Sequence, residues 1–66
     1  MISVVSSDIK SIGHENDKLE VQFLNGKKYQ FLHVPESVFT EFLKSPSKGK
    51  FLHAKISGHY PFILLN

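Results

Sequence analysis

The chain has 66 residues, a formal net charge of +2 and no cysteine. This length allows one domain, residues 1–66, of marginal stability, and the lack of cysteine excludes disulfides and cysteine-based zinc sites as its support. No segment reaches the roughly 18 apolar residues of a membrane helix, and the N-terminus lacks a signal-peptide pattern, so we expect a cytoplasmic protein without membrane contact.

Strands are expected first along the chain. Val4–Val5 and Ile9–Ile12 supply one or two short apolar strand segments, and Gly13–Lys18 is expected to form a polar turn. Apolar and polar residues then alternate on either side of Asn25-Gly26, along residues 19–23 and 28–33. This period of two predicts two half-buried strands joined as a hairpin.

The hairpin loop sets the register of these strands. A two-residue loop would pair the apolar face of one strand with the polar face of the other. A three-residue loop that places Gly26 in the left-handed bulge position pairs apolar residues instead: Val21 with Tyr29, and Leu19 with Phe31. We therefore expect the three-residue loop, with both aromatic side chains in the core rather than free to stack on bases.

Two short helices are expected next. The first begins at Pro35, because proline favours the first helical position, and it ends before the Ser45-Pro46 step. Ser47 is a suitable N-cap for the second helix, which should end near Gly58.

The C-terminal segment, residues 60–65, is very apolar for a chain end. It either completes the sheet or packs on another subunit. The predicted fold is therefore α+β, with a small antiparallel three-stranded meander followed by two short helices, in the order β-β-β-α-α. A short C-terminal strand and an oligomer arm are the two alternatives for the tail.

Charge is unevenly distributed along the chain. All six acidic residues lie at or before Glu41, whereas residues 42–66 carry four lysines, two histidines and no acid. Unbalanced positive charge raises the local concentration of anions. A solvated lysine-rich face is the simpler explanation, and it is kept beside the functional one.

The most informative part of this basic third is the expected start of the second helix, where two lysines, a serine and a glycine meet. Unpaired backbone N–H groups and the helix dipole attract anions there, which favours a phosphate ligand, although the spacing of a Walker loop is absent. Two histidines and a tyrosine could assist by hydrogen bonding or by stacking, and tail packing is the alternative for the tyrosine. The predicted ligand-binding residues are Ser47, Lys48, Gly49, Lys50, His53, His59 and Tyr60.

No metal, cofactor or catalytic site is expected. The four histidines match no familiar ligand spacing. No serine lies in a GxSxG elbow, and the acids are confined to the other part of the chain. Since no nucleophile has a partnered base, we expect a protein that is not an enzyme.

Several motifs run along nearly the whole chain. They are Ser6-Ser7-Asp8-Ile9, Ile12-Gly13-His14, Tyr29-Gln30-Phe31, Val34-Pro35-Glu36, Ser47-Lys48-Gly49-Lys50-Phe51-Leu52-His53-Ala54 and Gly58-His59-Tyr60-Pro61. Together they resemble the KTSC domain, which is named for the C-terminal extension of some lysyl-tRNA synthetases and also occurs in small bacterial and phage proteins.

The resemblance implies a binding function. Small phage proteins similar to this chain are associated with evasion of bacterial immunity, because they sequester cyclic oligonucleotide signals in a homo-oligomeric sponge. We therefore expect a homo-oligomer, taken as a tetramer, that binds a cyclic oligonucleotide such as a cyclic dinucleotide in the bacterial host cytoplasm. An RNA- or tRNA-binding module is the alternative, placed second because net charge is low and arginine is absent. A protein-interaction module that uses the tail or a strand edge is the third.

Overall fold

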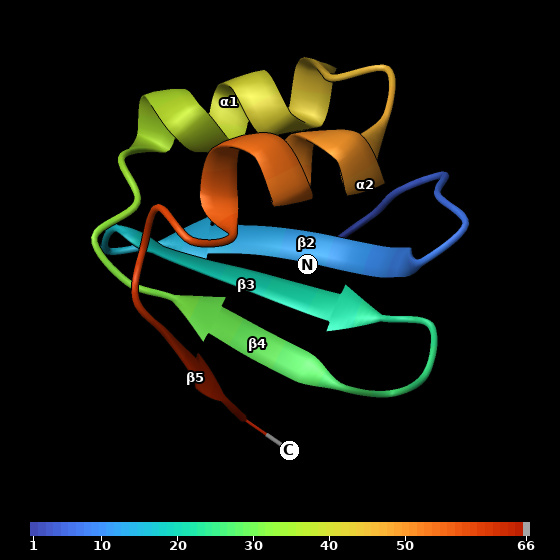
Figure 1. The fold of residues 1–66 in the computed structure, drawn as a ribbon, viewed down its shortest axis with the longest axis horizontal. Coiled ribbons are helices and arrows are strands. Elements are labelled where there is room, and N and C mark those ends of the chain that lie inside the picture. The colour runs from blue at the N-terminus through green and yellow to red at the C-terminus, as the bar shows by residue number, and fades with distance from the viewer. Residues whose placement is uncertain (66) are drawn as a thin grey trace.

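The computed structural model describes residues 1–65, which form an antiparallel sheet with helices packed on one of its faces (Figure 1). Asn66, the last residue of the predicted domain, lies outside the described residues. Within residues 1–65, the sheet contains five strands in chain order. The strands are β1 (Ile2–Ser3), β2 (Ile9–Glu15), β3 (Lys18–Phe23), β4 (Lys28–Phe31) and β5 (Phe62–Leu64). The helices are α1 (Glu36–Lys44), α2 (Lys48–Phe51) and its π-helical continuation η1 (Leu52–Ile56).

The prediction of a three-stranded sheet is wrong, because each edge carries one further short strand. β1 pairs with β2, with Ile2 opposite Ile12, and it lies immediately before the segment Val4–Val5 where a strand was expected. β5 pairs with β4 at the other edge. A strand of two or three residues is too short to show a recognisable alternation of apolar and polar residues. Whether such a segment forms a strand depends on the neighbouring strand with which it pairs. For the tail, the strand alternative is confirmed.

The three-residue hairpin loop between β3 and β4 is confirmed. Phe23 N donates to the Lys27 carbonyl at 2.8 Å and Gly26 N donates to the Phe23 carbonyl at 3.0 Å. Gly26 has a φ of 92°, in the left-handed region that glycine adopts without steric cost. The register also follows the prediction, with Val21 opposite Tyr29 and Leu19 opposite Phe31.

The turn between β2 and β3 is tighter than the predicted segment of residues 13–18. Only Asn16 and Asp17 lie between the strands, with φ values of 53° and 60°. Two consecutive positive φ values are typical of a type I′ turn, and short polar side chains tolerate this conformation. β2 therefore continues to Glu15, and β3 begins directly after the turn.

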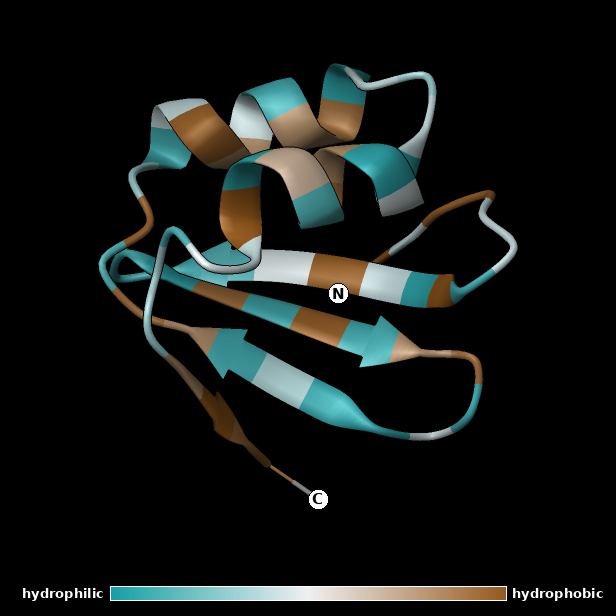
Figure 2. Ribbon diagram, in the orientation of Figure 1, coloured by the Kyte–Doolittle hydropathy of each residue, from teal (hydrophilic) through white to brown (hydrophobic). Residues whose placement is uncertain are grey.

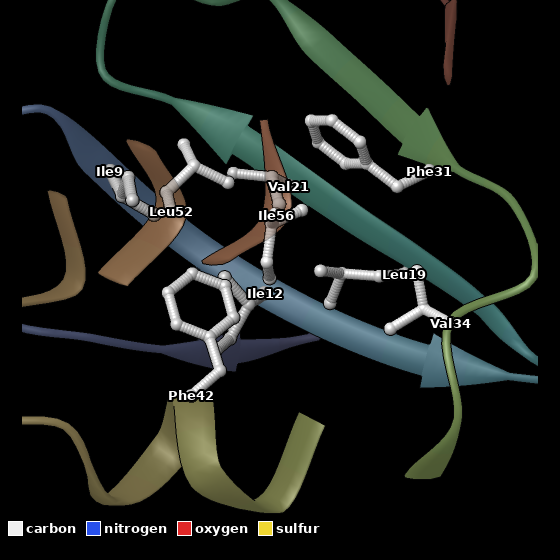
Figure 3. Close-up of a cluster of buried hydrophobic side chains, with 9 residues drawn as sticks. All are labelled: Ile9, Ile12, Leu19, Val21, Phe31, Val34, Phe42, Leu52 and Ile56. Atoms are coloured by element: carbon white, nitrogen blue, oxygen red, sulfur yellow. The ribbon is translucent and has the colours of Figure 1, made fainter. Parts of the chain in front are cut away.

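The apolar core lies between the sheet and the helices (Figure 3). Figure 2 shows the alternation of apolar and polar residues along the strands that supplies the sheet side of this core. The aromatic ring of Phe42 in α1 is fully buried and stacks on Phe51 of α2 at 5.2 Å. Phe31 is buried and Tyr29 packs against the core, so the prediction that both are packing residues is confirmed. The core consists of Ile9, Ile12, Leu19, Val21, Phe31, Val34, Phe42, Leu52 and Ile56.

The helical segment closely follows the predicted boundaries. Pro35 is the N-cap of α1 rather than its first residue, and α1 ends at Lys44. Ser47 caps α2 as predicted, since its hydroxyl accepts from Lys50 N at 3.4 Å. η1 ends with a bond from Ser57 N to the Leu52 carbonyl, the five-residue step of a π-helix. Among the described residues, no helix has the length and apolar character needed to cross a membrane.

Candidate functional site

The connection between β1 and β2 passes the start of α2 (Figure 1). The side chains of these two segments line an open groove. One wall is formed by residues 5–8 and the other by residues 46–50 with His53 and Ala54. We call this feature the α2 groove. Its volume is about 840 Å³, within the roughly 300–1,000 Å³ range of small-molecule sites.

The α2 groove brings together most of the predicted ligand-binding residues. Ser47, Lys48, Gly49, Lys50 and His53 line it. The last two predicted residues, at positions 59 and 60, lie beyond the far end of η1 and do not line it.

The distance to these last two residues follows from helix geometry. α2 and η1 form a helical segment from Lys48 to Ile56, and a helix rises about 1.5 Å per residue. His59 and Tyr60 follow this segment, and both of their backbone N–H groups donate to the Ile56 carbonyl. Tyr60 packs against the core, as the tail-packing alternative proposed. Their position in the basic third of the sequence groups His59 and Tyr60 with the lysines, but the fold places them away from the α2 groove.

Hydrogen bonds fix the corner that leads into α2. The Ser45 hydroxyl donates to the Ser47 carbonyl at 2.9 Å. The Lys48 ammonium donates to the Ser45 carbonyl at 2.5 Å, so this half-buried side chain is held against the corner. An ammonium has three donors, so two remain available to a ligand. Lys50 is exposed at the same end of α2.

The opposite wall begins with a turn that Ser6 stabilises. Its hydroxyl accepts from the backbone N–H groups of Asp8 at 3.2 Å and Ile9 at 3.3 Å. This turn directs the chain into β2 and brings the Asp8 side chain to the start of α2. A Cβ built on Gly49 would lie 4.0 Å from Asp8 Oδ2. Within the described residues, the carboxylate makes no hydrogen bond or ion pair.

Asp8 changes the chemistry that the sequence predicted for this place. An acid-free basic segment predicts a purely cationic site, whereas the fold brings a carboxylate from the N-terminal part of the chain against it. The α2 groove therefore offers two ammonium groups and one acceptor-only group. Such a set suits a ligand that carries both negative charge and hydrogen-bond donors.

The residues of the second wall were missed because charge was followed along the chain rather than through space. One signal was available, since the polar Ser6-Ser7-Asp8 run between two apolar strand segments is among the motifs quoted above. A polar run at a strand connection indicates a loop, and loops carry a large share of binding residues.

The histidines play separate roles in the fold. His14 Nε2 donates to the Val34 carbonyl at 2.7 Å, and its ring stacks on Phe39 at 5.3 Å. His33 adopts a φ of 63° in the bend between β4 and α1. In residues 1–65, no cluster of three or more His, Cys, Asp or Glu side chains could hold a metal ion.

The chain is a small α+β domain with a polar groove at the start of one helix. Comparison with known proteins shows the family to which this domain belongs. The KTSC domain matches residues 5–60, a stretch that contains both walls of the α2 groove. The chain belongs to the KTSC domain family. It is similar to the crystal structure of a KTSC domain protein from Yersinia pestis, with 39% sequence identity and a TM-score of 0.89. That similarity covers 97% of this chain and 93% of the other. No curated protein matches the chain.

Proposed function

We propose that this protein binds a small phosphate-bearing ligand in the α2 groove and holds it without chemical change. The observation that supports this most is the pair of lysines on one wall, Lys48 and Lys50, at the start of a helix without an acidic residue in its first turn. An anionic ligand would stabilise that arrangement, because it would offset the like charges of the lysines and the positive end of the helix dipole.

The ligand class that fits the groove best is a nucleotide. Phosphate groups suit the two ammonium groups, and the amino or imino donors of a base suit the Asp8 carboxylate on the facing wall. A cyclic dinucleotide carries two phosphates and two bases in a compact ring, and we propose it as the form of ligand. In that form the protein acts as a homo-oligomeric sponge for a cyclic oligonucleotide signal of bacterial immunity.

RNA is the weaker candidate for the same groove. A polynucleotide binder needs a basic track that follows several phosphates. Here only two lysines line the α2 groove, and the chain has no arginine to clamp a phosphate with two parallel hydrogen bonds.

Titration calorimetry with a panel of ligands tests the proposal. The panel contains cyclic di- and trinucleotides, a linear dinucleotide, a mononucleotide and inorganic phosphate. We expect micromolar or tighter binding of at least one cyclic nucleotide, and mass spectrometry should recover that ligand unchanged. No binding by any member rejects the proposal, and a tRNA gel shift that weakens steeply with salt would favour RNA instead.

Replacing Asp8 with asparagine is expected to separate the two kinds of contact. Asparagine keeps the size of the side chain and removes its negative charge near the lysines, so affinity for inorganic phosphate should rise severalfold. Affinity for a nucleotide whose base donates to Asp8 should rise less or fall, because the charged acceptor is lost. Ser7→Ala, on the same wall, is the control, and an equal response of both ligands to Asp8→Asn would contradict this assignment.

A further inference from the structure

Among the described residues, no strand pairs with the outer edge of β5. Leu65 N donates to the Lys28 carbonyl at 2.8 Å, and Leu32 N donates to the Pro61 carbonyl at 2.8 Å. Residues 61, 63 and 65 therefore direct their backbone groups toward β4, since hydrogen-bonding direction alternates along a strand. By the same alternation, the N–H and C=O groups of Phe62 and Leu64 point outward, away from the sheet.

The side chains along this edge are apolar and exposed. Phe62 and Leu64 are each 54% exposed, Ile63 is 46% exposed and Leu65 is 41% exposed. β5 is apolar along its whole length in Figure 2, and no charged residue lies between Pro61 and Leu65. The Phe62 ring lies 5.3 Å from Tyr29 and 5.7 Å from Phe31, so on that face of the sheet Phe62 continues the aromatic row of β4.

β5 is only three residues long, but the other features that usually protect a strand edge, namely charged residues, outward-facing prolines and bulges, are missing from it. Lysines, outward-facing prolines and bulges discourage pairing with another chain. Pro61 does not have this effect, because the N–H that it lacks would have pointed toward β4. At the opposite edge of the sheet, β1 is only two residues long, and a very short strand is itself a protective feature.

The open groups of β5 are self-complementary. If two copies run antiparallel with Phe62 opposite Leu64 of the second copy, both outward-facing residues form hydrogen-bonded pairs, and each Ile63 faces its own symmetry mate. Other registers that pair only outward-facing residues match fewer of these groups. Because residue 62 contacts 64 and 64 contacts 62, the arrangement is isologous and closes with twofold symmetry.

We propose that two copies of this chain pair through their β5 strands, antiparallel about a twofold axis at Ile63, and so form one continuous ten-stranded sheet. A second copy of this chain is favoured over an unrelated strand as the partner. The outward-facing backbone groups of two β5 strands pair in register, both edges are apolar, and neither carries a charged residue that would repel the other. A typical stable interface uses roughly 20–30 residues on each side, whereas this edge supplies mainly residues 61–65. The dimer is therefore concentration-dependent rather than permanent.

This dimer is independent of the proposed ligand binding. The α2 groove is built on the connection that follows β1, and β5 lies at the other edge of the sheet. Pairing through β5 leaves both grooves of the dimer accessible. Absence of the β5 dimer would therefore not argue against ligand binding in the α2 groove, and absence of ligand binding would not argue against the dimer.

Single cysteine variants test the register, because the chain has no cysteine of its own. At Ile63, a non-hydrogen-bonded pair, the Cα atoms of the two copies should be about 4.5 Å apart, within disulfide range. In the same register Phe62 faces Leu64 of the second copy, so the two Phe62 residues, and likewise the two Leu64 residues, are offset by two positions. Their Cα atoms are then farther apart than the roughly 7 Å that a disulfide can span. In a glutathione buffer, Ile63→Cys should give at least about tenfold more disulfide dimer than Phe62→Cys and Leu64→Cys. Equal fractions in all three would overturn the proposal.

Sedimentation measurements test the surface without a cross-link. The unmodified protein should shift from monomer to dimer as its concentration rises. Phe62→Lys should remain monomeric, whereas Leu24→Lys, which adds the same charge at an apolar residue that is 57% exposed elsewhere, should still dimerise. A monomer at every concentration up to the millimolar range, or a mass that grows without limit, would overturn the closed dimer. Circular dichroism confirms that both lysine variants are folded before they are compared.

Discussion

Replacing Phe42 with alanine is expected to remove most of the stability of this protein. The side chain is fully buried, and its ring stacks on Phe51 at 5.2 Å with an interplanar angle of 14°, which joins α1 to α2. Truncation of a buried phenylalanine costs about 3–5 kcal/mol. At about 0.05–0.15 kcal/mol per residue, a chain of this length has a total stability of only about 3–10 kcal/mol, so the variant should be partly unfolded at 25 °C.

Phe62→Ala is the matched control for this prediction, because it deletes the same atoms at a side chain that is 54% exposed. Its loss of stability should be less than half that of Phe42→Ala, since much of the ring is already in contact with water. Urea unfolding followed by circular dichroism in dilute solution measures both. Equal unfolding midpoints for the two variants would show that the Phe42 contact does not have the weight assigned to it.

Reversing the charge of Lys48 and Lys50 together is expected to weaken nucleotide binding at least about 100-fold. Hydrogen bonds that involve charged groups contribute about 1.5–3 kcal/mol each, so two lost contacts are sufficient for that factor. The new glutamates would also repel the phosphates. They should not unfold the protein, because acidic side chains are favourable in the first turn of a helix.

A second double reversal controls for overall charge. Lys44 and Lys55 belong to the same basic third but do not line the α2 groove. Changing both to glutamate alters the net charge equally, and affinity measured by calorimetry should fall less than about fivefold at physiological salt, where distant charges are screened. Equal losses in the two double variants would indicate a diffuse electrostatic attraction rather than a site at the start of α2.

The parts of the fold that were predicted correctly are those with a local physical cause. The loop that ends at Gly26 was predictable because only one loop length keeps apolar residues on the same face of both strands. The cap at Ser47 was predictable because a serine before a helical segment satisfies otherwise unpaired backbone donors. In both cases the chemistry lies within a few neighbouring residues.

The parts that were missed depend on contacts between distant segments. β1 and β5 exist because β2 and β4 offer them partners, and a two- or three-residue segment does not reveal its partner. Only one wall of the α2 groove was predicted, because the capped start of α2 can be recognised from neighbouring residues. Asp8 on the other wall lies 39 positions before Ser47 in the sequence, and only the fold brings the two together. His59 and Tyr60 were grouped with the lysines by charge and chain position, and the intervening helical segment separates them.

The order in which strands meet has a consequence for the kinetics of folding. The hairpins β2–β3 and β3–β4 close over loops of two and three residues, and hairpins of this kind form in about 1–10 μs. β5 can reach β4 only after residues 32–61 have been arranged, and longer loop closures cost more entropy. β5 should therefore pair last during folding and separate first in native-state fluctuations. This edge strand is then the element of the sheet with the lowest free energy of local unfolding.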